Sequence, residues 1–354
     1  MKKVLKYLTV IILSGTVYII CLILIPRNYD VKGRLRNETL LTWDLSTGSK
    51  ISYTKVSTTV KATISNPPII YLHGGPGGKI TKGIIEDLQP LADEGFDLYF
   101  YDQVGSGYSN RLENIEEYTV ERHIADLKEI IDKIGAAEVI LMGQSWGAVL
   151  LTQFIARYPE RVKKAIFTSP APIFPVRRAL ADLESPDSLH FKTPRFSNQQ
   201  GNQKIGNLRS KTTRWYAYSF GKKLMSDEEA DNFFTVLNGV LNKSVVCDVS
   251  NVLKPTKGSG YYAHIMTMKS LNEVVVDIRG KLKILNIPIL VMKGQCDNQS
   301  WGFAQEYLKL FSNHELSVIE NAGHSIAIEQ AEQYIKTLKG FLAKASHQTS
   351  EMYN

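Results

Sequence analysis

The chain has 354 residues, of which 44% are hydrophobic and 22% charged, and it contains three cysteines. This composition excludes a disordered protein, which cannot bury enough apolar surface, and a small domain held together by disulfides. The net charge of +7 is small for this length, so its distribution along the chain matters more than its size. The length suits two domains or one large domain with an insertion.

The N-terminus is an uncharged apolar segment. Residues 7–25 form a run of 19 residues without charge, and Lys2, Lys3 and Lys6 precede it. As a helix this run spans roughly 28 Å, close to the thickness of a bilayer core. A cleaved signal peptide has a shorter apolar stretch that ends in small residues, whereas this one ends in Cys-Leu-Ile-Leu-Ile-Pro. We therefore expect residues 1–28 to be an uncleaved signal anchor; a cleaved signal is the alternative.

The orientation of this anchor is less strongly encoded. Arg27, Lys32, Arg34 and Arg36 follow the apolar run, so basic residues flank both of its ends almost equally. By analogy with typical N-terminal anchors, we expect a single-pass membrane protein whose remaining chain lies outside the cytoplasm.

Short apolar runs alternate with helical patterns along the rest of the chain. A hairpin is expected first, with strands at 40–44 and 50–56 around Ser-Thr-Gly-Ser. The later runs have the length of strands buried on both faces: 69–72, 98–101, 139–142, 165–168, 289–292 and 316–319. The helical patterns lie between them, at 80–93, 120–134, 148–158, 302–311 and 326–342. This alternation predicts an α/β fold, a mostly parallel sheet flanked by helices.

The alternation stops between residues 171 and 285. This stretch is longer than any ordinary connection, so we expect an inserted, mainly helical lid. The core then consists of residues 38–170 and 286–344, and residues 345–354 are expected to be a flexible tail.

The strongest motif is Gly143-Gln144-Ser145-Trp146-Gly147. It lies directly between a predicted strand and a predicted helix, which is the setting of a nucleophile elbow. Such a turn exposes the Ser145 hydroxyl at a helix N-terminus, where developing negative charge is favoured. The alternative is an ordinary glycine-rich turn.

A second glycine-rich segment, His73-Gly74-Gly75-Pro76-Gly77, follows the predicted strand at 69–72. Loops of this kind direct backbone N–H groups at an oxyanion. We predict the donors to be the N–H groups of Gly75 and Trp146.

A nucleophilic serine needs a base, and the base needs an orienting acid. Asp297 and His324 each follow one of the last two predicted strands. The chain order Ser145, Asp297, His324 is the order that this architecture requires. Asp102 also lies after a strand, but it precedes the insertion, and we interpret it as a turn-forming residue.

Together these motifs resemble the α/β-hydrolase fold family, and within it the proline iminopeptidase-like branch. The resemblance rests on His-Gly-Gly-Pro-Gly at 73–77, Asp-Gln-x-Gly-x-Gly-x-Ser at 102–109 and Gly-Gln-Ser-Trp-Gly at 143–147. It covers roughly residues 51–342, weakly in the lid. It implies that Ser145, Asp297 and His324 are the nucleophile, the acid and the base. We also expect Gly74, Trp215 and Tyr218 to contact the substrate; ordinary packing of the lid is the alternative for the two aromatic residues.

The chain departs from the family pattern at two places. Val104 replaces the usual arginine after Asp-Gln. In the lid, Trp215-Tyr216-Ala217-Tyr218-Ser219 has Ser219 where the family's glutamate helps to bind the substrate's α-amine. Other lid acids, Glu228, Glu229 or Glu273, are candidates to replace that glutamate, and the sequence selects none of them.

The lid also holds the surplus charge of the chain. Residues 171–285 contain 17 basic and 10 acidic residues, and residues 188–226 contain eight basic residues and no acidic one. A solvated basic surface explains this run; an anionic neighbour, such as a lipid surface or an acidic substrate group, is the sharper hypothesis. We expect no nucleic acid partner, because no recognition motif accompanies the charge. No cofactor or metal is expected, and Cys296 is interpreted as a packing residue rather than a reactive thiol.

We therefore predict a membrane-anchored serine hydrolase. The first expectation is an aminopeptidase of the proline iminopeptidase type, acting on short peptides or amino-acid amides. The alternatives are a carboxylesterase for small esters and a small-molecule receptor with little turnover.

Overall fold

A computed structural model of the chain describes residues 2–34, 40–60, 66–193, 196, 205–273 and 276–344. Its centre is an eight-stranded sheet in the order β1-β2-β4-β3-β5-β6-β7-β8. The strands are β1 (Leu41–Asp44), β2 (Lys50–Val56), β3 (Ile69–Leu72), β4 (Leu98–Tyr101), β5 (Val139–Gln144), β6 (Val162–Thr168), β7 (Ile289–Gly294) and β8 (His314–Ile319). Strand β2 pairs antiparallel with both β1 and β4, and the remaining pairings, from β4 across the sheet to β8, are parallel. The predicted mostly parallel sheet is therefore confirmed.

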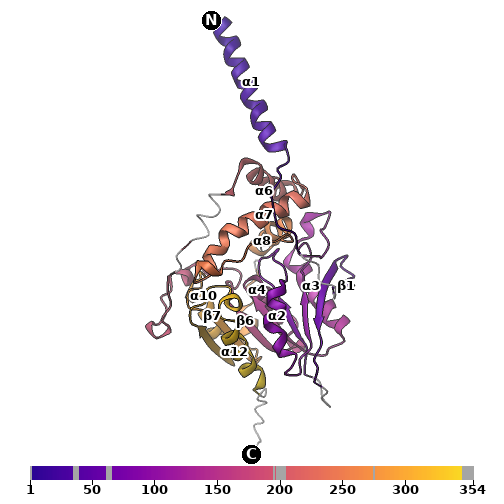
Figure 1. The fold of residues 1–354 in the computed structure, drawn as a ribbon, viewed down its shortest axis with the longest axis vertical. Coiled ribbons are helices and arrows are strands. Elements are labelled where there is room, and N and C mark those ends of the chain that lie inside the picture. The colour runs from indigo at the N-terminus through magenta and orange to yellow at the C-terminus, as the bar shows by residue number, and fades with distance from the viewer. Residues whose placement is uncertain are drawn as a thin grey trace, which may run out of the picture.

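Helices cover both faces of this sheet (Figure 1). They are α2 (Lys82–Leu88), α3 (Val120–Ile134), α4 (Trp146–Ile155), α10 (Trp301–Leu310), α11 (Ile326–Glu329) and α12 (Ala331–Ala343). Strand β3 shows why two layers form: Ile70 and Leu72 belong to the hydrophobic cluster that includes α3, α4 and α10, whereas Ile69 and Tyr71 belong to the cluster that includes α2 and α12. Since successive side chains of a strand point to opposite faces, an all-apolar strand needs a cover on each side.

Two helices differ from the prediction. The pattern at 80–93 becomes α2 followed by a short 3-10 helix, Gln89–Leu91, because Thr81 caps the N-terminus and Pro90 interrupts the helix. The pattern at 326–342 is divided into α11 and α12 at Gln330, whose backbone (φ −139°, ψ 53°) is not helical. As a result, the short helix α11 directly follows in sequence the loop that carries His324.

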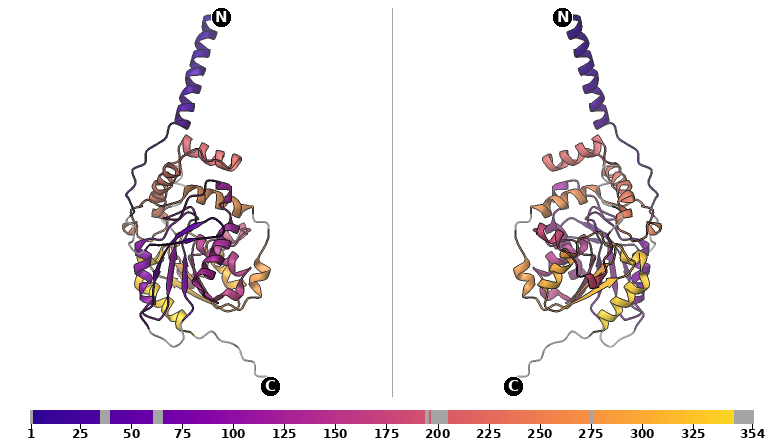
Figure 2. Two further views of the ribbon diagram at one scale, coloured as in Figure 1. Left: turned by 90° about the vertical axis from the view of Figure 1, so that its right-hand side faces the viewer. Right: turned by 90° about the vertical axis from the view of Figure 1, so that its left-hand side faces the viewer.

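The stretch between β6 and β7 is helical in the part of it that the structure describes. It contains α6 (Leu208–Phe220), α7 (Asp227–Leu241), α8 (Tyr261–Asn272) and α9 (Arg279–Lys283). Short 3-10 helices connect them at Arg178–Asp182, Asp187–Leu189, Asn242–Ser244 and Val249–Asn251. We call residues 171–285 the helical insertion. Figures 1 and 2 show α6, α7 and α8 lying between the sheet and the N-terminal helix.

The N-terminal helix α1 (Lys2–Leu24) projects away from the rest of the molecule (Figure 1). It is long and apolar enough to cross a membrane, and its apolar window is 0% buried; a signal sequence near an N-terminus has the same properties. The last turn of α1 and the chain that follows it contact the insertion, because Arg209 donates to the carbonyl oxygen of Ile23 and the N–H of Arg27 donates to Glu229 at 2.9 Å.

Some expectations fall on residues outside the described ranges. These are the predicted tail, residues 345–354, and also Arg36, Arg195 and Lys204.

Candidate active site

Ser145 lies in a sharp turn between β5 and α4. Its backbone has φ 54° and ψ −114°, a conformation that residues with a Cβ rarely adopt. Hydrogen bonds fix the turn: the N–H of Ser145 donates to the carbonyl oxygen of Thr168 at 3.1 Å, and its own carbonyl accepts from the N–H of Ala148 at 3.0 Å. The strand–turn–helix setting of the motif is therefore present.

The flanking glycines make this turn possible. A Cβ on Gly143 would lie 2.5 Å from the carbonyl oxygen of Gly147, and a Cβ on Gly147 would lie 2.0 Å from the carbonyl oxygen of Leu72. Both contacts are with backbone atoms that cannot move aside, so glycine is required at both positions.

Asp297 and His324 lie together at the ends of β7 and β8. His324 Nδ1 and Asp297 Oδ1 are 2.8 Å apart, and both side chains are buried. The Asp297 carboxylate also accepts from the N–H of Gln299 at 3.0 Å. A carboxylate bonded to Nδ1 fixes the ring orientation and directs Nε2 away from itself, as a general base requires.

A buried lysine, Lys293, completes this group and was missed by the sequence analysis. Its Nζ donates to Asp297 Oδ2 at 3.0 Å and to the carbonyl oxygen of Gln299 at 2.6 Å. Burial alone would raise the pKa of Asp297, but electrostatic attraction to Lys293 and His324 and the hydrogen bonds from His324 and the Gln299 N–H hold that pKa well below its usual range. The only signal of Lys293 in the sequence is a single lysine that follows four apolar residues of a buried strand.

The glycine-rich loop at 73–77 lies against the elbow. A Cβ on Gly74 would lie 3.3 Å from the Cβ of Ser145 and 2.5 Å from the side-chain oxygen of Gln144. Gly75 has φ +128°, which only glycine adopts easily. The loop predicted to supply one oxyanion donor is thus next to the predicted nucleophile.

Gln103, also missed by the sequence analysis, links this loop to the elbow. Its side-chain nitrogen donates to the carbonyl oxygen of His73 at 3.0 Å, and its side-chain oxygen accepts from Trp146 Nε1 at 2.8 Å. The preceding residue, Asp102, accepts from the N–H groups of Ile80 at 2.8 Å and Tyr108 at 2.9 Å, in keeping with a turn-forming role.

Three other histidines, two of them buried and His264 partly buried, are held by neighbours. The N–H of Gln103 donates to His73 Nε2 at 3.0 Å, and burial lowers the pKa of His73. Burial lowers the pKa of His123 to about 3 and that of His264 to about 4. His123 Nε2 lies 3.1 Å from Thr267 Oγ1, and His264 Nδ1 lies 3.0 Å from the carbonyl oxygen of Pro76. Neutral, hydrogen-bonded rings of this kind are part of the packing.

A cavity of about 940 Å³ borders the loops of the site. Gly75 and Ser325, the neighbour of His324, line it, whereas Ser145 and His324 themselves are not among its lining residues. Its charged lining consists of Lys32, Arg34, Lys79, Lys82, Lys254 and Asp102. Asp102 is paired with Arg34 at 2.9 Å, and burial together with Arg34 lowers the pKa of Lys79 to about 8.

The predicted substrate contacts of the insertion do not line this cavity. Trp215 lies on α6 with 58% of its surface exposed and packs against Phe220 at 5.5 Å between ring centres. Tyr218 stacks with Arg214, whose guanidinium is 5.2 Å from the ring centre. Both residues therefore remain predictions as substrate contacts.

The three acidic residues of the insertion that could replace the family's glutamate also lie away from this cavity. Glu229 forms a buried ion pair with Arg209 at 2.6 Å, and Glu228 pairs with Lys257 at 2.9 Å. Glu273 lines a different hollow, next to Arg157. None of the three is available at the cavity as a partner for a substrate amine.

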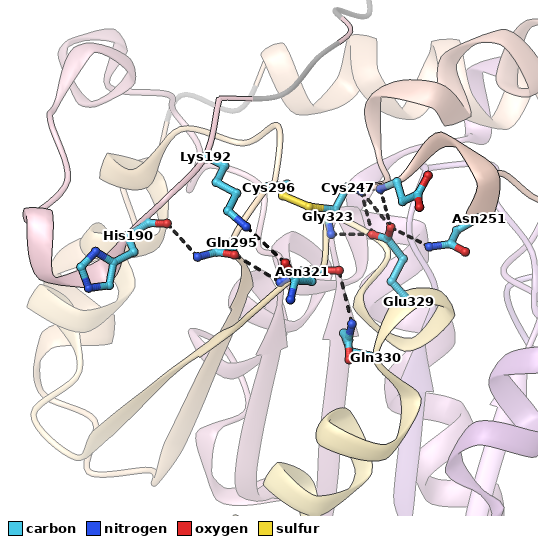
Figure 3. Close-up of a disulfide and its surroundings, with 11 residues drawn as sticks. His190, Lys192, Cys247, Asn251, Gln295, Cys296, Asn321, Gly323, Glu329 and Gln330 are labelled. Atoms are coloured by element: carbon cyan, nitrogen blue, oxygen red, sulfur yellow. Dashed lines mark hydrogen bonds between the residues drawn. A yellow bond between two sulfur atoms is a disulfide. The ribbon is translucent and has the colours of Figure 1, made fainter.

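Cys296 forms a disulfide with Cys247 of the insertion (Figure 3), so its interpretation as a packing residue is wrong. The two residues are 49 positions apart, and their Cα atoms are 5.2 Å apart. The pairing depends on where the insertion folds back onto the sheet, which no local pattern encodes. Cys21, on α1, is free and exposed.

The comparisons with known proteins agree with this fold. The family model described as alpha/beta hydrolase fold matches residues 67–331. The proline iminopeptidase of Saccharolobus solfataricus is 24% identical over 284 residues, which cover 78% of this chain and 85% of the relative. That of Clostridium botulinum is 25% identical over 292 residues, which cover 80% of this chain and 92% of the relative.

A solved structure has the same fold across almost its whole length. The esterase of Exiguobacterium antarcticum matches with a TM-score of 0.58 at 19% identity, covering 86% of this chain and 99% of that one. The family match spans most of the chain, from just before β3 to the start of α12. The chain is therefore a hydrolase that belongs to the α/β-hydrolase fold family, and proline iminopeptidases are among its relatives.

Proposed function

We propose that the protein is a serine hydrolase with Ser145 as nucleophile, His324 as base and Asp297 as orienting acid. The observation that carries this proposal is the buried 2.8 Å contact between His324 and Asp297, at the same edge of the sheet at which the β5–α4 turn presents Ser145. The N–H groups of Gly75 and Trp146 would then form the oxyanion hole.

The reaction proceeds in two acyl-transfer steps. His324 Nε2 takes the proton of the Ser145 hydroxyl while the oxygen attacks the substrate carbonyl. The oxyanion of the tetrahedral intermediate accepts hydrogen bonds from the two N–H groups, and His324 then protonates the leaving group. Water attacks the acyl-enzyme by the same route, which releases the acid and restores Ser145. Asp297 remains ionised throughout and stabilises the imidazolium.

For the substrate, the first candidate is a short peptide or an amino-acid amide, cleaved at its N-terminus. Two observations support it: proline iminopeptidases are relatives over most of their length, and the motifs at 73–77, 102–109 and 143–147 resemble that branch.

A specific observation favours the second candidate, a small ester. An N-terminal substrate presents an ammonium group, which needs a carboxylate partner when it is buried. In the described part of the cavity lining, the single carboxylate is Asp102, and Arg34 already occupies it. The lysines of the lining would also repel an ammonium group, whereas an uncharged acyl group has no such requirement.

The decisive experiment has two parts. A fluorophosphonate probe should label the wild-type protein, and Ser145→Ala should lose both labelling and turnover while keeping its melting temperature. Ser169→Ala, in the loop after β6, serves as the matched serine control and should still be labelled. Labelling that survives in Ser145→Ala would contradict the nucleophile assignment. Prolyl and alanyl amide chromogens, compared with short-chain esters, then separate peptidase from esterase by kcat/KM.

We also propose that α1 anchors the protein in a membrane, with the hydrolase outside the cytoplasm. The apolar helix and the Cys247–Cys296 disulfide support this, since disulfides persist in oxidising compartments. Retention in the membrane fraction after alkaline carbonate, together with protease accessibility of the hydrolase in intact cells, tests both parts.

A further inference from the structure

We propose that the Cys247–Cys296 disulfide and the carboxylate of Glu329 form one clamp, through which the helical insertion positions the Asp297 and His324 loops. This inference rests on the proposed function, because it assigns positioning residues for that reaction. Neither group would touch the substrate or the reacting atoms.

The disulfide holds the acid loop. Cys296 directly precedes Asp297 at the end of β7, and Cys247 lies in the insertion between two 3-10 helices. The bond therefore ties the insertion to Cys296 (Figure 3), the neighbour of the carboxylate that is bonded to His324.

Glu329 holds the base loop to the same part of the insertion. Its carboxylate accepts the N–H of Gly323, the neighbour of His324, at 2.6 Å. It also accepts the N–H groups of Cys247 at 2.8 Å and Asp248 at 2.9 Å, and the side-chain amide of Asn251 at 3.1 Å (Figure 3). One carboxylate thus satisfies donors from both the insertion and the catalytic loop.

The backbones at this junction are in direct contact. The N–H of Ser325 donates to the carbonyl oxygen of Val245 at 3.0 Å, and the N–H of Cys296 donates to the carbonyl oxygen of Ala322 at 2.9 Å. A Cβ on Gly323 would lie 2.6 Å from the carbonyl oxygen of Val245, so the base loop has no room to move toward the insertion.

The two catalytic loops therefore have a shared support outside the sheet. Without it, the positions of Asp297 and His324 would depend on the strand ends and on their mutual contact. A misplacement of about 1 Å is enough to lower turnover by about 100-fold. Loss of the clamp is expected to lower kcat and to leave KM nearly unchanged, because the clamp acts on the orientation of the base and not on substrate binding.

The test compares Glu329→Gln, the double variant Cys247→Ala/Cys296→Ala and all three changes together. Glutamine keeps the size of the side chain but turns one acceptor oxygen into a donor that faces backbone N–H groups. Glu332→Gln, an exposed acid in the first turn of α12, and Cys21→Ala, the free cysteine of α1, are the matched controls.

We expect each clamp variant to lower kcat and the rate of fluorophosphonate labelling by about 10- to 100-fold, with KM within about twofold of wild type. The triple variant should lose little more than either alone, because a clamp opened at one side no longer fixes both loops. Both controls should match wild type. All rates are measured well below the melting temperature of each variant.

Reduction of the wild-type protein provides a second route if a variant fails to fold. A water-soluble phosphine takes an oxygen from water, and its two electrons and the two protons go to the sulfur atoms, which become thiols. The same fall in kcat and labelling is expected on reduction.

The outcomes separate the two proposals. Wild-type rates in the folded clamp variants and in the reduced protein would overturn the clamp and leave the serine mechanism intact. Variants that lose only thermal stability, with kcat unchanged, would also overturn it. If the wild-type protein is not labelled at Ser145, the proposed function itself fails.

Discussion

The sheet and the helical insertion both contain buried residues, but they are held together differently. Strands such as β3 and β7 are apolar throughout or nearly so, and helices cover them on both faces. The insertion instead contains a buried ion pair, Arg209–Glu229, between α6 and α7, in which the side chains are 3% and 6% exposed. The sheet is specified by local sequence pattern, whereas the insertion depends on contacts between residues distant in sequence.

The difference extends to function. The predicted nucleophile, acid and base all follow strands of the sheet, and the structure places the latter two in contact. The predicted substrate contacts Trp215 and Tyr218 lie on the insertion, outside the lining of the cavity. The proposed catalytic residues could therefore be selected from strand ends, whereas the residues that would contact the substrate depend on how the insertion packs.

The largest expected effect lies on the sheet side. Asp297→Asn should lower kcat by about 10⁴-fold, because the amide no longer fixes the tautomer and charge of His324. Steady-state kinetics with the preferred chromogen measure this change. The variant leaves the Lys293 ammonium buried without its carboxylate partner, so Lys293→Met/Asp297→Asn is the control: its stability should recover while its activity stays low. Recovered activity in the double variant would contradict the assigned role of Asp297.

An intermediate effect is expected in the insertion. Arg209→Met should destabilise the protein by roughly 3–5 kcal/mol, because it leaves the Glu229 carboxylate buried without its cationic partner. Lys223→Met, which removes a more exposed pair with Asp227, should change stability by less than about 1 kcal/mol. Urea unfolding of both variants gives the comparison. Equal effects would show that the insertion does not depend on its buried ion pair.

The smallest effect is expected for a substitution at Asp126, a buried carboxylate on α3. Burial raises the pKa of Asp126, on α3, to about 6, and hydrogen bonds and Arg122 offset this only in part. A raised folded-state pKa contributes stability that is complete below about pH 4 and is lost as the pH rises through about 6. Asp126→Asn removes this dependence, so the variant should gain on the order of 1–3 kcal/mol relative to wild type between pH 4 and pH 8.

Thermal unfolding across this pH range measures the difference between the two proteins. A pH-independent difference would mean that Asp126 does not titrate in this range.

Much of the sheet and part of the site could be predicted from the sequence. The eight strands appear because their apolar runs are short and end at glycine, proline or aspartate, and Ser145 is marked by glycines that its turn requires. His324 and Asp297 could be selected because both follow strands late in the chain. Apart from the chain order of Ser145, Asp297 and His324, each of these signals is local in the sequence.

The rest depended on contacts that no local pattern encodes. Lys293 forms part of the site only because β7 directs it toward Asp297, and in the sequence it is a single lysine. Gln103 matters through its bonds to His73, in the loop after β3, and to Trp146, at the start of α4. Predicting the disulfide would have required knowing where Cys247 of the insertion comes to lie next to the end of β7. The acid that the resemblance left open in the insertion was not found among Glu228, Glu229 and Glu273.

The attachment of the N-terminal helix has a practical consequence for producing the protein in soluble form. Arg209 and Glu229 satisfy part of their bonding through the carbonyl oxygen of Ile23 and the N–H of Arg27. A recombinant chain that starts at residue 28 would lack Ile23 and Arg27, and Arg209 and Glu229 would each lose one of their hydrogen-bond partners. Truncation just before Ile23 removes most of the apolar helix and keeps both bonds, so that start site should give the better-folded preparation.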